Sequence, residues 1–192
     1  MSQKTLNAQA MREVYKTQAQ LTDKQFDELL DGTRRINELE LGGFRWHVAY
    51  LARDTYDTIP WSVHLEAWSA AHAMPYSGID DFYKRAIAAG ILPAWTLNRT
   101  TFHDPPTDKM PIGRLMVHLG LVSILELERA LGIQFLIREE LGLPTRIGRI
   151  LGAIASLSLP DSLQALGLQR GLAYVNLEQT LPIIERVVAK RS

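Results

Sequence analysis

Two segments of this chain repeat each other, and this repeat limits the possible folds more than any other feature of the sequence. The first is PIGRLMVHLGLVSILELERALGIQ at residues 111–134, and the second is RIGRILGAIASLSLPDSLQALGLQ at residues 146–169. The second segment starts 35 positions after the first, and eight of the 24 aligned positions are identical. Several other aligned pairs exchange one aliphatic side chain for another. Such a repeat predicts two copies of one small structural unit that pack together.

Each copy is predicted to form a hairpin of two helices. Gly120 is suited to end the first helix of the first copy. Ser123 with Glu126 is a capping-box pattern that begins the next helix, and Ser158 starts the corresponding helix of the second copy. Two such hairpins predict a four-helix core. Apolar residues at helical spacing define one face of the first helix in each copy: Ile112, Leu115, Met116 and Leu119, then Ile147, Ile150, Leu151 and Ile154.

Packing alone explains the aliphatic residues but not the glycine and arginine at the start of each copy. These residues are Gly113 and Arg114 in the first copy, and Gly148 and Arg149 in the second. A glycine at this place lets a ligand come close to the backbone. Free backbone N–H groups at a helix start attract anions. The pattern therefore favours an anionic ligand, and the alternative is a pair of stacked hairpins whose glycines serve only in turns.

At these residues the sequence resembles the MshEN family, the cyclic-di-GMP-binding form of the N-terminal domain of type II secretion and type IV pilus ATPases. The family motif is a tandem of R-L-G-x-x-φ-φ-x-x-G-φ-φ-x-x-x-x-L-x-x-x-L-x-x-Q, where φ is Leu, Val or Ile. The first copy matches at Ile112, Gly113, Met116, Val117, Gly120, Leu121, Val122, Leu127, Leu131 and Gln134. The second matches at Arg146, Ile147, Gly148, Leu151, Leu157, Leu166 and Gln169. The resemblance covers residues 110 to about 180.

The sequence also departs from the family pattern. Pro111 stands where the first copy should begin with arginine. The second copy has Gly152, Ala155, Ser156 and Ser162 where the family has an aliphatic residue, a glycine, an aliphatic residue and a leucine. The G-x-x-x-x-G-K-[ST] sequence of an ATPase does not occur in the chain.

The resemblance implies that the chain binds cyclic di-GMP, a two-fold-symmetric anion with two guanines and two phosphates, and that each copy supplies one half-site. Arginine can pair with guanine or phosphate, and glutamine can both donate and accept hydrogen bonds. The candidate ligand-binding residues are Ile112, Gly113, Arg114, Leu127, Leu131 and Gln134 in the first copy, and Arg146, Ile147, Gly148, Arg149, Leu166 and Gln169 in the second.

Helical spacing extends through the rest of the chain, so we expect a mainly α fold. Residues 1–98 are predicted to form a helical module of unknown role, with a further capping box at Thr22 and Gln25. The proline-containing residues 99–110 are predicted to be a linker, and residues 111–192 form the tandem-motif domain. The segment AYVNL has strand character, so at most a short β segment is expected.

The composition excludes several classes of function. Lysines and arginines equal aspartates and glutamates at 21 each, so the net charge is zero and a general nucleic-acid binder is not expected. The absence of cysteine excludes disulfides and thiolate chemistry. The five histidines form no close pair for a metal, and no nucleophile-turn motif occurs. We therefore expect a non-catalytic protein without a metal or cofactor.

The alternative interpretation is a protein–protein docking or adaptor module of the secretion-ATPase type that binds no nucleotide. Under both interpretations a protein partner is expected, from secretion, pilus, polysaccharide or other regulated machinery. The polar start of the sequence is unlike a signal peptide, and its longest apolar stretch is too short to span a bilayer. These features favour a cytoplasmic protein of bacterial second-messenger signalling that does not insert into the membrane.

Overall fold

The structure of the chain is a computed structural model that describes residues 7–41, 45–98, 110–155 and 157–189. Over these residues it contains ten α-helices, one short 3₁₀ helix and no strand, which confirms the mainly α fold. Residues 99–109 of the predicted linker lie outside the described residues.

The helices fall into two sets of five along the chain. The first set is α1 (Ala8–Ala19), α2 (Asp23–Glu38), α3 (Val48–Thr55), α4 (Trp61–Ala71) and α5 (Ile79–Ala88), followed by the 3₁₀ helix η1 (Ala94–Leu97). The second set is α6 (Ile112–His118), α7 (Ile124–Leu141), α8 (Ile147–Ile154), α9 (Leu159–Gln169) and α10 (Leu177–Ala189).

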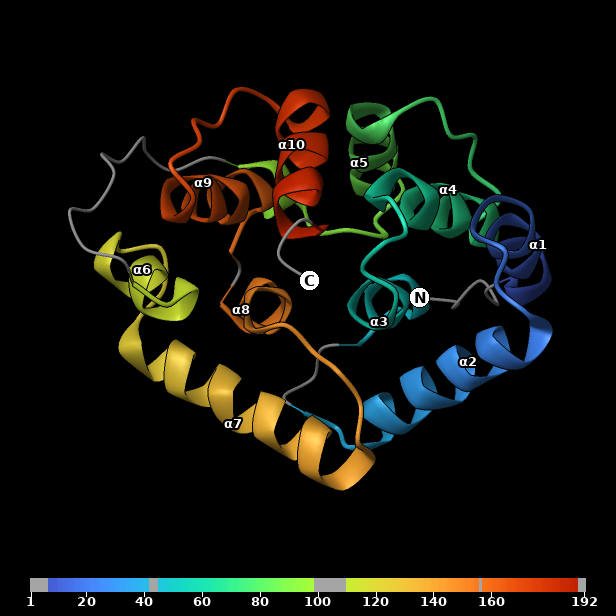
Figure 1. Cartoon of the computed structure of the whole chain (residues 1–192), viewed down its shortest axis with the longest axis horizontal. Helices are drawn as coiled ribbons and strands as arrows, with labels where there is room; N and C mark the ends of the chain where they lie inside the picture. Colours follow the sequence, from blue (N-terminus) through green and yellow to red (C-terminus); the bar gives the residue numbers. More distant parts are fainter. Residues whose placement is uncertain (1–6, 42–44, 99–109, 156, 190–192) are drawn as a thin grey trace.

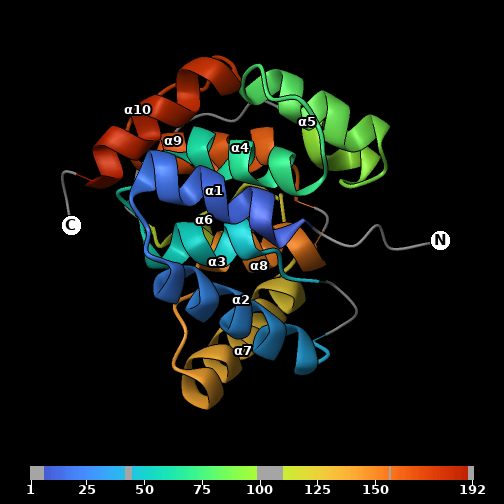
Figure 2. The same cartoon turned by 90° about the vertical axis from the view of Figure 1, so that its right-hand side faces the viewer.

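The two sets of helices have similar internal packing, except that α6 also packs against α8. In the first set α1 packs against α2 and α4, α2 against α3, α3 against α4, and α4 against α5. In the second set α6 packs against α7 and α9, α7 against α8, α8 against α9, and α9 against α10. Figures 1 and 2 show α5 and α10 in one outer layer, α4 and α9 beneath them, then α3 and α8, and finally α2 and α7. The described structure is therefore built from two similar five-helix units, the first unit (α1–α5) and the second unit (α6–α10).

Local sequence signals explain how several corresponding helices begin. The second helix of each unit starts with a complete capping box, formed by Thr22 and Gln25 in α2 and by Ser123 and Glu126 in α7. Both capping boxes agree with the sequence pattern. The third helices are eight residues long and the fourth helices eleven. These matches support a common architecture for the two units, although the tandem repeat is evident in the sequence of the second unit alone.

The apolar core joins the two units. One cluster of buried residues combines Phe26 of α2 and Leu51 of α3 with Ile137 of α7 and Ile150 of α8. A second cluster combines side chains of α4 and α5 with side chains of α9 and α10. Because buried apolar area is the main favourable contribution to folding, contacts between the units contribute to the stability of the whole chain.

The predicted strand at AYVNL is wrong. Residues 173–176 have no strand pairing, and Leu177 already belongs to α10. The side chain of Asn176 accepts a hydrogen bond from the backbone N–H of Gln179 (2.9 Å), and the backbone N–H of Thr180 bonds to the carbonyl of Asn176 (2.9 Å). Asparagine commonly begins helices in this way, so a local helix start overrides the β-propensity of the segment.

Candidate functional site

The start of α8 binds a carboxylate group from the first unit. Arg146 precedes the first residue of α8, and its backbone N–H donates to Asp54 Oδ2 at 3.2 Å. The guanidinium of Arg149 donates from Nε to Asp54 Oδ1 at 2.6 Å. Arg146 also lies 3.6 Å from Asp54 and 3.7 Å from Asp57. Two arginines predicted to bind an anion are thus brought together, and both face carboxylates of the same chain.

The centre of this arginine–carboxylate cluster is shielded from solvent, and its edge is partly exposed. The side chain of Asp54 is fully buried, whereas those of Arg149 and Arg146 are 18% and 41% exposed. The Arg149 guanidinium lies 5.1 Å from the ring centre of Trp61 and 5.5 Å from that of Tyr50. A buried carboxylate is costly unless it is paired and hydrogen-bonded, and the two arginines supply these partners to Asp54.

A second ion pair extends the cluster toward α10. The guanidinium of Arg53 lies 3.9 Å from the Glu185 carboxylate and donates to the backbone carbonyl of Asp57 at 2.7 Å. Burial lowers the pKa of Arg53, and the nearby Glu185 partly offsets this effect. Burial also raises the pKa of Glu185, while the backbone N–H of Trp61 and the charge of Arg53 act in the opposite direction. The cluster therefore connects α3, α8 and α10.

The glutamine that ends each copy of the tandem repeat contacts the beginning of the other copy. Gln134 donates from Nε2 to the carbonyl of Thr145 at 2.6 Å, directly before Arg146. Gln169 donates from Nε2 to the carbonyl of Met110 at 2.8 Å, directly before Pro111. Correspondingly, α7 packs against α8 and α6 against α9. The sequence-based grouping placed each glutamine with its own copy, whereas hydrogen bonding places it with the other one.

The two motif glycines have different surroundings. A Cβ atom added to Gly113 would lie 2.6 Å from Leu127 Cδ1, so Leu127 covers this backbone position. A Cβ added to Gly148 would meet nothing within 4 Å. The residue of the second copy that aligns with Leu127 is Ser162, a shorter side chain. The departure from the family motif at Ser162 thus coincides with open space beside Gly148.

The other candidate residues divide between packing and surface positions. Arg114 is exposed on α6, and Leu131 is 49% exposed on α7. Leu127 is buried. The side chains that pack partly buried against the apolar clusters are Ile112, Ile147 and Leu166. The structure consequently brings Arg146 and Arg149 together at the α3–α8 contact, with Gln134 of α7 hydrogen-bonded directly before Arg146. Arg114 stands apart on the surface.

The most important residues missed by sequence reasoning are Asp54 and Asp57. The two aspartates are three positions apart in the segment RDTYD, residues 53–57, which has the composition of an ordinary charged surface segment. Asp54 lies 95 residues before its partner Arg149. The available signal was weak: Asp54 closely follows the apolar helix residues Ala49, Leu51 and Ala52, which suggests partial burial and hence a cationic partner.

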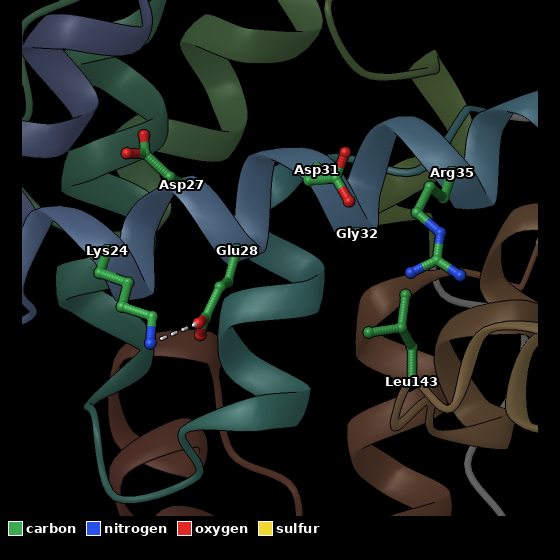
Figure 3. A pocket seen from close by; sticks show the side chains of 7 residues that line it. All are labelled: Lys24, Asp27, Glu28, Asp31, Gly32, Arg35 and Leu143. Carbon is green, nitrogen blue, oxygen red and sulfur yellow. Dashed lines mark ion pairs between the residues drawn. The ribbon is translucent and has the colours of Figure 1, made fainter.

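An open depression of about 590 Å³ lies elsewhere, on α2. Figure 3 shows its charged lining, including the ion pair of Lys24 and Glu28 (3.9 Å), with Leu143 at one end. It contains none of the predicted ligand-binding residues. Among the residues that the structure describes, no group of three or more His, Asp or Glu side chains is arranged to hold a metal ion. No helix in the described ranges combines the length and apolar character needed to cross a membrane.

Comparison with known proteins gives no match: no family model, curated protein or solved structure is detectably similar to this chain.

Proposed function

We propose that this chain is a non-catalytic, cytoplasmic receptor for cyclic di-GMP in bacterial signalling, with the tandem repeat supplying its two half-sites. The observation that carries the proposal is the reciprocal arrangement of the two copies. Gln134 and Gln169 make equivalent hydrogen bonds, each to the backbone carbonyl of the residue directly before the other copy. Two similar half-sites of this kind match the two similar halves of the ligand.

The start of α8 has the chemistry of an anion site. Its leading backbone N–H and the guanidiniums of Arg146 and Arg149 already converge on one carboxylate, that of Asp54. A phosphate carries the same charge sign and accepts the same hydrogen bonds, and arginine binds phosphate and guanine well. The open space beside Gly148 gives a ligand access to the adjacent backbone.

A ligand bound at the start of α8 would compete with carboxylates of the first unit for Arg146 and Arg149. Asp54 and Asp57 belong to α3 and the turn after it, and both contact Arg146. A phosphate that pairs with the arginines displaces at least one of these carboxylates, because the arginine donors are shared. Ligand binding would therefore change the contact between α3 and α8, which is how a receptor of this build would signal.

The second candidate is a docking module that binds no nucleotide. One observation favours it: the motif arginines are neutralised within the chain by Asp54 and Asp57. The coverage of Gly113 by Leu127 also closes part of the first copy to a ligand. Both candidates predict a protein partner, and they differ in whether cyclic di-GMP binds.

Isothermal titration calorimetry with cyclic di-GMP separates the two candidates. The receptor interpretation predicts saturable heat, and Arg146→Ala should weaken binding about tenfold or more because a charge-assisted hydrogen bond is lost. Arg114→Ala is the matched control, since this arginine is exposed and lies outside the α7–α8 contact. Folding of each variant is checked by circular dichroism. Absence of heat for the folded wild-type protein supports the docking module, and equal effects of the two variants would refute the proposed place of the site.

A further inference from the structure

The outward face of α7 exposes large apolar side chains. Ile124, Leu131 and Phe135 are 61%, 49% and 56% exposed. Leu125 and Leu136 lie beside them and are 72% and 42% exposed. Figure 1 shows α7 at the edge of the molecule, with only its inner side toward α8. Contiguous exposed apolar side chains of this kind mark interaction surfaces in folded proteins.

The five-helix architecture does not require this apolar face. The corresponding helix of the first unit, α2, has a charged outward surface with Lys24, Asp31, Arg34 and Glu38. Arg34 pairs with Asp31 and Glu38, each at 2.6 Å, and Figure 3 shows further charged side chains along the same helix. Since α2 occupies the equivalent place and is polar outside, the exposed apolar residues of α7 need an explanation of their own.

The exposed residues of α7 form a row with a seven-residue repeat. Ile124, Glu128, Leu131, Phe135 and Arg138 follow each other at spacings of 4, 3, 4 and 3 residues. This spacing is the one that lets two helices pack along a continuous seam. Glu128 is exposed, and the side chain of Arg138 is 67% exposed and pairs with its exposed neighbour Glu139 at 3.0 Å; such surface ion pairs are weak and can exchange partners. The row is thus available along its whole length.

Two copies of this row are complementary when the helices pair in antiparallel orientation with Ile133 at the centre. Leu131 of each copy then lies opposite Phe135 of the other, and Glu128 of each lies opposite Arg138 of the other. A parallel pairing would instead place Glu128 opposite Glu128 and Arg138 opposite Arg138, which repel each other. Moving the antiparallel pairing by one row position puts the charged residues opposite apolar ones. The charges therefore select one orientation and one register.

We propose that α7 is a self-association surface, on which the α7 helix of a second copy of this chain packs in the antiparallel direction. The contact has two-fold symmetry, so each surface is used once and the assembly closes as a dimer. Glu128 pairs with the partner's Arg138, and Phe135 packs against the partner's Leu131. Gly132, where an added Cβ atom would meet nothing within 4 Å, lets the two helices approach closely.

The charges on α7 also indicate that its exposed face binds a protein and not a membrane surface. Glu128, Glu139 and Glu140 are exposed on the same helix as Arg129 and Arg138. An anionic lipid surface attracts basic faces and repels such carboxylates, whereas a second α7 supplies the opposite charge at each paired position. A second copy accordingly fits the row better than a lipid surface.

Sedimentation equilibrium of the full chain tests this proposal without any ligand. The apparent mass should rise from the chain mass of 21.6 kDa toward twice that value with increasing concentration. Glu128→Arg and Arg138→Glu should each suppress association, because either change places like charges opposite each other. Glu140→Arg is the matched control: it makes the same charge change on α7, away from the row, and should associate like the wild type. Circular dichroism confirms that the variants are folded.

Mixing the two charge variants gives the decisive result. In an equimolar mixture of E128R and R138E, both cross-pairs join opposite charges, so the pair should form a heterodimer although neither variant forms a homodimer. The proposal is overturned if the wild type stays monomeric up to about 0.5 mM, because a dimer with a weaker dissociation constant would not be a specific association. It is equally overturned if E128R associates like the wild type, or if the mixture remains monomeric. None of these outcomes depends on whether the chain binds cyclic di-GMP.

Discussion

At the scale of single residues, identical motif positions have acquired different roles in the two copies. Gly113 and Gly148 are aligned in the sequence and each is the second residue of its helix. Leu127 packs directly over Gly113, whereas no atom lies near the position of a Cβ on Gly148. The first glycine is thus explained by close packing, and the second is not. Under the proposed receptor function, this open backbone position at a helix start beside two arginines would give a ligand access.

Alanine at these two positions should change the stability in opposite directions. In Gly113→Ala the new Cβ clashes with buried Leu127, and overpacking of a core typically costs about 1–3 kcal/mol. In Gly148→Ala the Cβ enters free space, and the better helix propensity of alanine contributes up to about 1 kcal/mol. Urea unfolding of both variants measures the difference. If ligand access is the reason for Gly148, the more stable Gly148→Ala protein should also bind cyclic di-GMP more weakly; similar stabilities for the two variants would refute this asymmetry.

At the scale of helices, two histidines anchor the first unit. His64 of α4 is fully buried and shares a hydrogen bond of 2.9 Å with the hydroxyl of Tyr15 in α1. His47 precedes α3, where its Nδ1 accepts a hydrogen bond from the backbone N–H of Ala49 and its ring stacks on Trp68 at 4.1 Å. Burial lowers the pKa of both histidines from 6.5 to about 3. The nearby cations Arg53 and Arg149 lower the pKa of His64 further.

These lowered pKa values predict loss of stability in weak acid. The unfolded chain binds protons at both histidines near pH 6.5, while the folded chain does so only near pH 3. Stability is therefore complete above pH 6.5 and falls as the pH is lowered, by up to about 1.4 kcal/mol per pH unit for each histidine. Urea unfolding between pH 7.5 and pH 5 measures this slope. His64→Gln, although less stable at pH 7.5, should keep only about half of the slope; a pH-independent wild type would contradict the prediction.

The helices also explain why their starting points could be predicted from the sequence, whereas the expected strand was wrong. The capping boxes at Thr22 and Ser123 and the helices after them depend on residues three or four positions apart, so local patterns identify them. The strand expected at AYVNL failed because β-propensity describes a surface that packs in a sheet, and no other strand is described for it to join.

Contacts between distant residues were not accessible in this way. The exchange of Gln134 and Gln169 between copies depends on how two hairpins pack, which the repeat alone does not specify. Asp54 reaches Arg149 across 95 residues of chain. The similarity of the two five-helix units could not be predicted from the sequence either. Packing determines which positions are apolar, but different apolar residues can fill them, so similar units need not have similar sequences.

At the scale of the whole molecule, the first unit resembles the second in architecture but lacks the arginines found at the start of α8. His47 stands before α3 in the place that Arg146 has before α8, and its ring stacks on Trp68 instead of facing a carboxylate. The first unit supplies Asp54, which occupies the arginines of the second. The second unit is therefore the candidate sensor, and the first unit supplies the carboxylates that pair with its arginines. In this arrangement, a ligand that binds the arginines must alter the contact between the units.

Tryptophan fluorescence should report this change. All four tryptophans lie in the first unit and the segment after it, at positions 46, 61, 68 and 95. Trp61 is the one whose ring lies 5.1 Å from the guanidinium of Arg149. If cyclic di-GMP draws Arg149 away from Asp54, the cation also leaves the indole ring, and the emission of Trp61 should change as the ligand saturates.

Trp61→Phe is the matched control, because it keeps an aromatic ring under Arg149 and removes the reporting indole. This variant should still bind the ligand in calorimetry but lose most of the emission change. A ligand shifts an equilibrium only through its different affinity for two states, so the size of the change should follow the calorimetric saturation curve. Saturating binding without any change in emission would mean that the ligand leaves the α3–α8 contact intact. The arginine–carboxylate cluster would then stabilise the fold without transmitting a signal.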